Sequence, residues 1–496
     1  MSIDQSIITE RMLSAAEHPV IRGFHPDPSI CRVGDDYYLV NSSFEYSPGV
    51  PLWRSSDLVN WTQIGNILDR ADQFSAGAAG SNGGIYAPTI RHHDGRFWMI
   101  TTNVSGEPGQ LLVSATNPQG PWSAAVIIPG LNGIDPDLAW GDDGTCYVTF
   151  CSNDPETSGI AQVRVDLEHG IALEAPRRLW QGTGLAYPEG PHLFRRGEWW
   201  YLLISEGGTE RGHAITMARS RSPQGPFESA PNNPLFSRRS TTFPTQNTGH
   251  ADFIECADGS WAMVYLGVRP RGGTPLFHVN GRETFVAKIE WDRSGWPTIV
   301  PDGFAVPAPH GFTDDFTGPG LAPRWISPGA GFSDFLSFHP EGGVALRAAA
   351  AINEAPALLS VRAQDERWRF TAVLELPTAA GLRVRMDERH WYEIRVVDGV
   401  AQVQAQIGPV HNVVVDQQQL SGSSVELMVE AADPTSNGPD DLSFSVADAT
   451  GTRELGRLDG RYLSTEVAGG FTGRTIGVHA LDGVARLLRV SYEPLE

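Results

Sequence analysis

Several short segments in the first 260 residues place an acidic or histidine side chain beside proline or glycine. The side chains that could do chemistry in these segments are Asp27, Asp135, Glu189 and His250. Carboxyl groups held together in a low-dielectric pocket shift each other's pKa, so that one stays protonated while another is ionised. That combination is what general acid–base catalysis requires.

Each of these residues also has a simpler explanation. An aspartate next to proline commonly caps a turn through its own carboxylate. A calcium site built from the same oxygens is a second alternative. For a single Asp-Pro pair the turn is the better explanation, but three acids and a histidine at matching places in a repeat favour a shared site.

A repeat supplies the elements that must position these residues. An acidic or glycine turn followed by an alternating aromatic strand recurs at positions 36, 94, 142, 197 and 258. Each interval has the length of one four-stranded blade, which predicts a five-bladed β-propeller, with a long meander or sandwich as the alternative. Equivalent segments of successive blades lie around the central axis, so we expect the acids and His250 to meet there.

The chain changes character near residue 305. A proline-rich stretch is followed by cleanly alternating strands such as 369–376 and 391–397, which are typical of an antiparallel β-sandwich. The fold prediction is all-β, a propeller followed by a sandwich of jelly-roll type. We divide the chain into an N-terminal extension (1–17), the propeller (18–304), a linker (305–312) and the sandwich (313–496).

Composition excludes several classes of function. The formal net charge of −21 disfavours binding to nucleic acid or to an anionic membrane, and no Gly-Lys-Ser/Thr phosphate loop occurs. The sequence gives no reason to expect an organic cofactor. The first residues lack the apolar run of a signal peptide, so we expect a cytoplasmic protein. Homo-oligomer formation is left open.

The segments 23–30, 133–136 and 189–192 resemble the three signature motifs of glycoside hydrolase family 43, which contains β-xylosidases and α-L-arabinofuranosidases. The segments 43–50, 206–209, 249–252 and 281–284 match in the same order, and the C-terminal region resembles the family's concanavalin-like sandwich.

The resemblance implies a role for each residue. Asp27 corresponds to the general base, Glu189 to the general acid, and Asp135 to the carboxylate that orients the acid and raises its pKa. His250 corresponds to a residue at an axial water or metal, commonly Ca²⁺. The implied substrate-binding residues are Phe44, Tyr86, Ala87, Ile134, Thr209 and Arg282.

The resemblance further implies an exo-acting, inverting hydrolase that releases β-1,4-linked D-xylose from short xylo-oligosaccharides. An α-L-arabinofuranosidase or a bifunctional enzyme is the alternative, because Tyr46-Ser47 and Tyr86 depart from the family pattern in the pocket wall. A non-catalytic sugar-binding propeller is a more remote alternative. We also expect a loop of the sandwich to narrow the pocket, with Phe332 and Phe335 as candidates.

Overall fold

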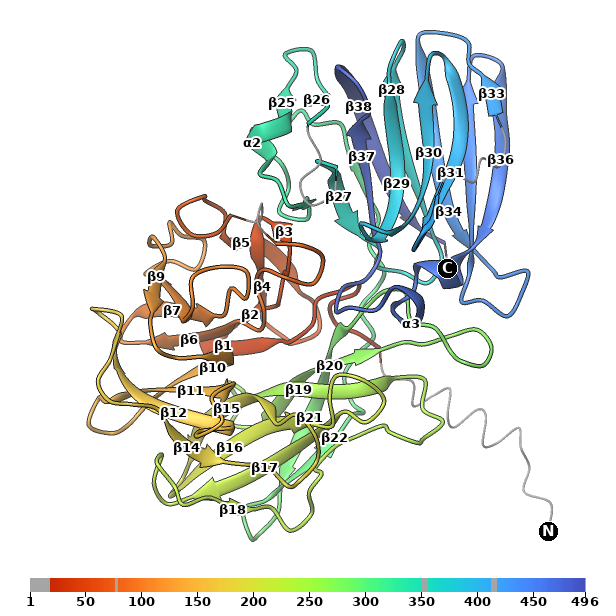
Figure 1. Cartoon of the computed structure of the whole chain (residues 1–496). Coiled ribbons are helices and arrows are strands. Elements are labelled where there is room, and N and C mark those ends of the chain that lie inside the picture. Colours follow the sequence, from red (N-terminus) through yellow and green to blue (C-terminus); the bar gives the residue numbers. More distant parts are fainter. Residues whose placement is uncertain (1–17, 76–78, 350–355, 412–416, 496) are drawn as a thin grey trace, which may run out of the picture.

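The computed structural model describes residues 18–75, 79–349, 356–411 and 417–495, so the predicted extension (1–17) lies outside the described residues. Figure 1 shows two bodies, a propeller coloured red to green and a sandwich coloured teal to blue. Among the described residues the only helical elements labelled are the short α2 (Phe332–Phe335), η2 (Gly460–Leu463) and α3 (Thr465–Ala468). The predicted all-β fold is confirmed.

The propeller consists of five antiparallel sheets within the described chain. Each blade starts with a strand next to the axis, and we call these the inner strands: β1 (Ser29–Val33), β6 (Thr89–His93), β10 (Gly133–Trp140), β15 (Glu189–Arg196) and β19 (Gln246–Glu255). The remaining strands of blades 1 and 2 are β2 (Asp36–Val40), β4 (Gly49–Ser55), β5 (Thr62–Leu68), β7 (Arg96–Thr101), β8 (Gln110–Ala115) and β9 (Val126–Ile128). Those of blade 3 are β11 (Cys146–Ser152), β12 (Gly159–Asp166), β13 (Ile171–Ala172) and β14 (Arg177–Trp180). Blades 4 and 5 are completed by β16 (Trp199–Glu206), β17 (Ala214–Ser220), β18 (Glu228–Ser229), β20 (Trp261–Val268), β21 (Glu283–Trp291) and β22 (Pro297–Val300).

The paired aromatics of the repeat pack the blades against one another. Side chains on a strand alternate between the two faces of its sheet, so Tyr37 packs against blade 5 while Tyr38 packs against blade 2. Trp200 and Tyr201 divide in the same way between blades 3 and 5. The period-two aromatic pattern thus fills the apolar layers between neighbouring blades.

The sandwich has two large antiparallel sheets, with one apolar core between them. One sheet contains β23 (Phe312–Asp314), β25 (Leu336–Phe338), β26 (Val344–Arg347), β28 (Trp368–Glu375), β34 (Ser424–Ala432), β35 (Asp441–Asp448), β36 (Gly451–Asp459) and β38 (Val484–Pro494). The other contains β27 (Leu359–Arg362), β29 (Ala380–Asp387), β30 (His390–Val397), β31 (Val400–Ile407), β32 (Val410–His411), β33 (Gln417–Gln419) and β37 (Thr475–Ala480).

Backbone pairing and buried ion pairs join the two bodies. The short strand β24 (Ser327–Pro328) pairs with β3 (Tyr46–Ser47) of the propeller. Arg385 of the sandwich lies 3.2 Å from the Glu45 carboxylate and donates to the Tyr46 hydroxyl. Because these groups are buried, the orientation of the sandwich over blade 1 is well defined. In the described residues, no helix is long and apolar enough to cross a membrane.

Candidate active site

The predicted acids lie at one end of the inner strands, where a bulge interrupts the pairing. In blades 3, 4 and 5 the register shifts between Ile134 and Asp137, between Glu189 and His192, and between Gly249 and Asp252. In these three blades the residue just after the first member of the pair has a left-handed backbone: Asp135, Gly190 and His250. A bulge re-aims the side chain it carries, and here it leaves Asp135 and His250 at matching positions. Asp27 of blade 1 has the same left-handed backbone just before β1.

The strand register corrects the expectation that Glu189 occupies the same position of the repeat as Asp27, Asp135 and His250. Glu189 is aligned with Ile134 and Gly249, one residue before the shared bulge position, which Gly190 occupies in blade 4. Gly190 has φ 56°, and a Cβ there would lie 3.0 Å from the His250 ring. The general-acid candidate is therefore offset by one residue from the other three groups, although it lies at the same end of the propeller.

Asp27 is held in its ionised form by its neighbours. Ser42 donates to Oδ2 at 2.6 Å, Arg282 donates to Oδ1 at 3.0 Å, and His250 Nδ1 lies 3.4 Å from Oδ1. Burial works to raise the pKa of Asp27, but Arg282, His250 and Ser42 outweigh it and leave the pKa below its ordinary value. An ionised carboxylate at neutral pH is what a general base must be.

Glu189 and Asp135 are shifted in the opposite direction. Burial, followed by the charge of Asp27, raises the pKa of Glu189 to about 7. Burial, together with the charges of Glu189 and Asp27, raises the pKa of Asp135 well above its ordinary value. The pair thus retains a proton near neutral pH. The Gly190 N–H donates to Asp135 Oδ2 at 3.0 Å, which fixes Asp135 beside Glu189.

Arg282 connects the base to the predicted binding residues. Its Nη1 donates both to Asp27 and to the Thr209 hydroxyl, at 3.1 Å, and its guanidinium lies over the Phe44 ring. Phe44 and Tyr86 meet edge to face, with ring centroids 5.6 Å apart. These four residues therefore lie together beside Asp27.

The two remaining predicted binding residues flank the acids. Ala87 occupies in blade 2 the sequence position that Asp27 occupies in blade 1, one residue before the proline. Ile134 directly precedes Asp135 at the start of the bulge. Ala87 is buried and Ile134 half-buried.

The sandwich contributes Phe471, a residue that sequence reasoning missed. Phe471 lies in the loop between α3 and β37 and stacks on Phe44 at 6.0 Å between ring centroids. It also meets the Tyr86 ring, and its carbonyl oxygen accepts from Arg282 Nη2 at 3.4 Å. The Asn82 side chain anchors the loop by accepting from the Phe471 N–H. A Phe-Thr-Gly run in a loop carries no sequence signal for this role.

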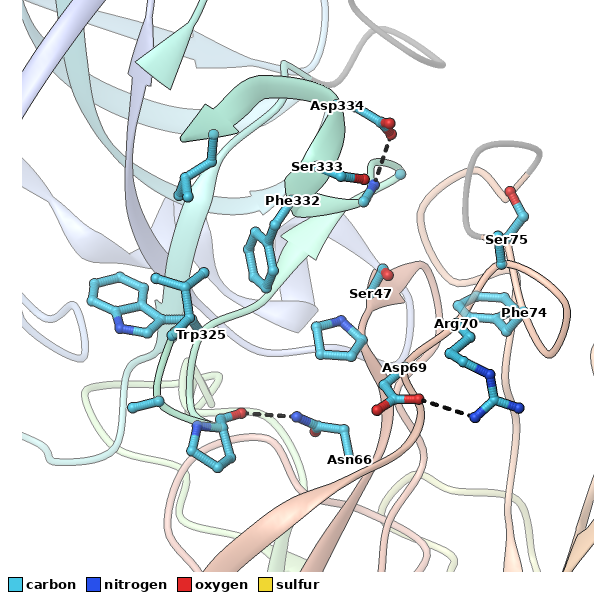
Figure 2. Close-up of a pocket in the computed structure, with 18 of the residues that line it drawn as sticks. Ser47, Asn66, Asp69, Arg70, Phe74, Ser75, Trp325, Phe332, Ser333 and Asp334 are labelled. Carbon is cyan, nitrogen blue, oxygen red and sulfur yellow. Dashed lines mark hydrogen bonds and ion pairs between the residues drawn. The ribbon is translucent and has the colours of Figure 1, made fainter. Parts of the chain in front are cut away.

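The two predicted candidates for this contact lie elsewhere. Phe335 is 1% exposed inside the sandwich core. Phe332 lines a separate cavity of about 700 Å³ between blade 1 and the sandwich. Figure 2 shows the Phe332 ring between Trp325 and the propeller residues Ser47 and Asp69. None of the three acids lines that cavity.

Arg91 fills the axis with a cluster that the sequence analysis also missed. Its guanidinium donates to Asp252 at 2.7 Å and to Asp137 at 2.6 Å, and lies 2.9 Å from His192 Nδ1. Asp137, His192 and Asp252 each stand at the end of their bulge. The cluster joins four inner strands around one half-buried cation and so supports the acids. The recurring polar residue after the bulge was the available signal.

The groups around His250 offer a calcium ion few direct protein ligands. Ca²⁺ takes six to eight oxygen ligands, whereas the carboxylate next to His250 Nδ1 is Asp27, which is already paired with Arg282. Among the described residues, no group of three or more His, Cys, Asp or Glu side chains is arranged to hold a metal. Burial lowers the pKa of His250 to about 4, so the imidazole is neutral and acts as a polar neighbour of Asp27.

Comparison with known proteins agrees with this geometry. The model of Glycosyl hydrolases family 43 matches residues 16–297, and that of the Beta xylosidase C-terminal Concanavalin A-like domain matches residues 313–488. The chain belongs to glycosyl hydrolase family 43 and is a glycosidase of its xylosidase/arabinosidase type.

Similar proteins cover nearly the whole chain. A non-reducing end alpha-L-arabinofuranosidase of Bacteroides ovatus is 37% identical over 93% of this chain and 90% of its own length. A xylosidase/arabinosidase of Butyrivibrio fibrisolvens is 35% identical over 94% of this chain and 95% of its own. The solved structure of Bacteroides ovatus Xyloglucan PUL GH43B has a TM-score of 0.88 at 33% identity, covering 97% of this chain and 100% of that one. Both the propeller and the sandwich are therefore shared.

Proposed function

We propose that the chain is an exo-acting, inverting pentosidase with Asp27 as general base and Glu189 as general acid. The observation that carries this proposal is the opposite shift of the two carboxyl groups, because the pKa of Asp27 is lowered while that of Glu189 is raised to about 7. Two carboxyls in one site with opposed protonation states are what glycoside hydrolysis needs.

The reaction follows from the protonation states of Asp27 and Glu189. Asp27 removes a proton from a water molecule, whose oxygen attacks the anomeric carbon. The glycosidic C–O bond breaks, its electron pair stays on the leaving oxygen, and Glu189 gives that oxygen its proton. Asp27 ends protonated and Glu189 ionised, and exchange with solvent restores both. Asp135, next to Glu189, disfavours early loss of the acid's proton.

The pocket wall supports a single terminal pentose as the substrate unit. The partly exposed rings of Tyr86 and Phe471, which pack on the buried Phe44, form an aromatic wall that suits the apolar face of a sugar. Arg282 and Thr209 offer polar contacts at the same place. The Phe471 loop of the sandwich lies against Phe44, Tyr86 and Arg282, and we expect it to favour a chain end over an internal unit.

We propose that both α-L-arabinofuranosyl and β-D-xylosyl ends are accepted. The names of the two full-length relatives support arabinose, and the second of them, together with the xylosidase-type sandwich, supports xylose. The test is to compare kcat/KM for the 4-nitrophenyl glycosides of the two sugars, with a time course on short xylo-oligosaccharides. Early release of monosaccharide is expected. Hydrolysis of neither glycoside, or longer products without monosaccharide, would contradict the proposal.

A further inference from the structure

His213 is a buried histidine that the mechanism above does not use. It lies in the loop between β16 and β17, is 1% exposed, and its Nε2 is 3.7 Å from Glu189 Oε1. Within the described chain, Nε2 has no hydrogen-bond partner. A buried polar atom without a partner, directed at a reacting carboxyl group, calls for an explanation.

The protonation of the ring follows from its other nitrogen. Nδ1 lies 3.0 Å from the carbonyl oxygen of Asn247. A carbonyl oxygen only accepts, so Nδ1 must carry a hydrogen. Burial lowers the pKa of His213 to about 3, and the ring is therefore neutral. In a neutral imidazole with Nδ1 protonated, Nε2 is a bare lone pair.

The fold makes room for this ring at one particular place. A Cβ at Gly249 would lie 2.1 Å from the ring carbon Cε1 and 2.3 Å from each ring nitrogen, so the imidazole packs directly on the Gly249 backbone. The hydroxyl of Ser237 donates to the His213 carbonyl oxygen at 2.7 Å and holds the loop. The ring therefore has little freedom to turn away from Glu189.

We propose that His213 is a positioning residue for the general acid, because its bare Nε2 faces the Glu189 carboxyl group and keeps that group protonated until the glycosidic oxygen takes the proton. A lone pair repels the ionised carboxylate and attracts the protonated form. This role rests on the proposed function of Glu189. The other charged or titratable groups acting on Glu189 are Asp135 and Cys151 of blade 3, Asp27 of blade 1 and Arg282 of blade 5.

Two substitutions separate this role from simple packing. In His213→Asn the amide nitrogen can take the place of Nδ1 and keep the bond to Asn247, but nothing replaces Nε2. In His213→Gln the longer side chain returns an amide oxygen to the place of Nε2. The measurement is the pH profile of kcat/KM on a substrate that needs acid assistance. We expect the alkaline limb to move about one pH unit lower in His213→Asn, on the scale of one hydrogen bond, and to recover at least half of that shift in His213→Gln.

A control variant and an NMR measurement separate the role of Nε2 from a general effect on the loop. Ser237→Ala removes a bond to the same residue without touching the ring, and its alkaline limb should stay where it is in the unmodified protein. An unchanged limb in His213→Asn, or equal shifts in the Asn and Gln variants, would overturn the proposal. If neither variant folds, nitrogen-15 NMR of the unmodified protein decides. Protonated Nδ1 and bare Nε2 from pH 5 to 9 support it, and an Nε2–H tautomer contradicts it.

Failure of the proposed function would look different. If Glu189 is not the general acid, Glu189→Ala retains the alkaline limb whatever the His213 variants do. If His213 has no role, Glu189→Ala abolishes that limb while His213→Asn leaves it in place.

Discussion

The propeller and the sandwich contribute to the candidate active site in different ways. The propeller supplies the ionisable groups. Asp27, Asp135 and Glu189 lie at the same end of three blades, next to the Arg91 cluster. The sandwich supplies binding contacts, because Phe471 brings an aromatic ring to Phe44 and a carbonyl oxygen to Arg282. The comparison implies that changes in the inner strands should act on the chemical step, whereas changes in the sandwich loop should act on sugar binding.

Asp27→Ala should have the largest effect of any single substitution in the pocket. Loss of the base removes the activation of water, and kcat should fall by about 10²–10⁴-fold, the usual scale for general acid–base catalysis. A dinitrophenyl glycoside should not restore the rate, because a better leaving group does not activate water. Kinetics on both nitrophenyl and dinitrophenyl substrates check this. Recovery with the better leaving group would remove Asp27 from the role of base.

Glu189→Ala should cause a loss that depends on the leaving group. On poor leaving groups we expect a fall of about 10²-fold or more, because the leaving oxygen departs without a proton. On a dinitrophenyl glycoside the loss should be much smaller. The nitrophenyl and dinitrophenyl glycosides used for Asp27→Ala measure this difference. Equal losses of Glu189→Ala on the two substrates would show that Glu189 does not protonate the leaving oxygen.

Phe471→Ala tests the contribution of the sandwich. Loss of the ring that stacks on Phe44 should reduce kcat/KM about 10-fold, equivalent to ~1.4 kcal/mol, mainly through KM. The matched control is Phe332→Ala, because Phe332 lines the separate cavity shown in Figure 2. Its kinetic constants should not change. Equal effects of the two substitutions would mean that the sandwich acts only through general stability.

Ser42→Ala should have the smallest effect and should be visible only in the pH profile. The Ser42 hydroxyl donates to Asp27 and helps to lower the pKa of that carboxyl group. Without it the pKa rises, and because Asp27 acts when ionised, the acidic limb of kcat/KM should move to higher pH by less than about one unit. The alkaline limb should not move. A shift of the acidic limb to lower pH would contradict the assignment.

The sequence predicted the parts of the site that follow the repeat. Alternating aromatics such as Tyr37 and Tyr38 indicated blades, and the turn spacing indicated how many. Asp27 and Asp135 could be placed together because equivalent positions of blades converge. Glu189 lies one residue before the position that Asp27 and Asp135 share, because Gly190 holds the bulge position in blade 4. The proline that follows Asp27, Asp135 and Gly190 is the sequence signal for this offset.

The parts that depend on unique tertiary contacts could not be predicted. Phe471 reaches the pocket through a non-repeating loop anchored by Asn82, nearly 400 residues away in sequence. His213 faces Glu189 only because Gly249 of the next blade leaves room for its ring. Such contacts join single residues that no periodicity connects, so the sequence offers no pattern for them.

The stereochemistry of the product tests the central claim most directly. If Asp27 activates water while Glu189 protonates the leaving oxygen from the opposite side, the first sugar formed must have inverted anomeric configuration. Proton NMR of the anomeric signal, recorded before mutarotation, measures it. We predict α-xylose from a β-xyloside and β-arabinofuranose from an α-arabinofuranoside. Retention of configuration would mean that a carboxylate attacks the sugar itself and would contradict the assignment of Asp27 as the base.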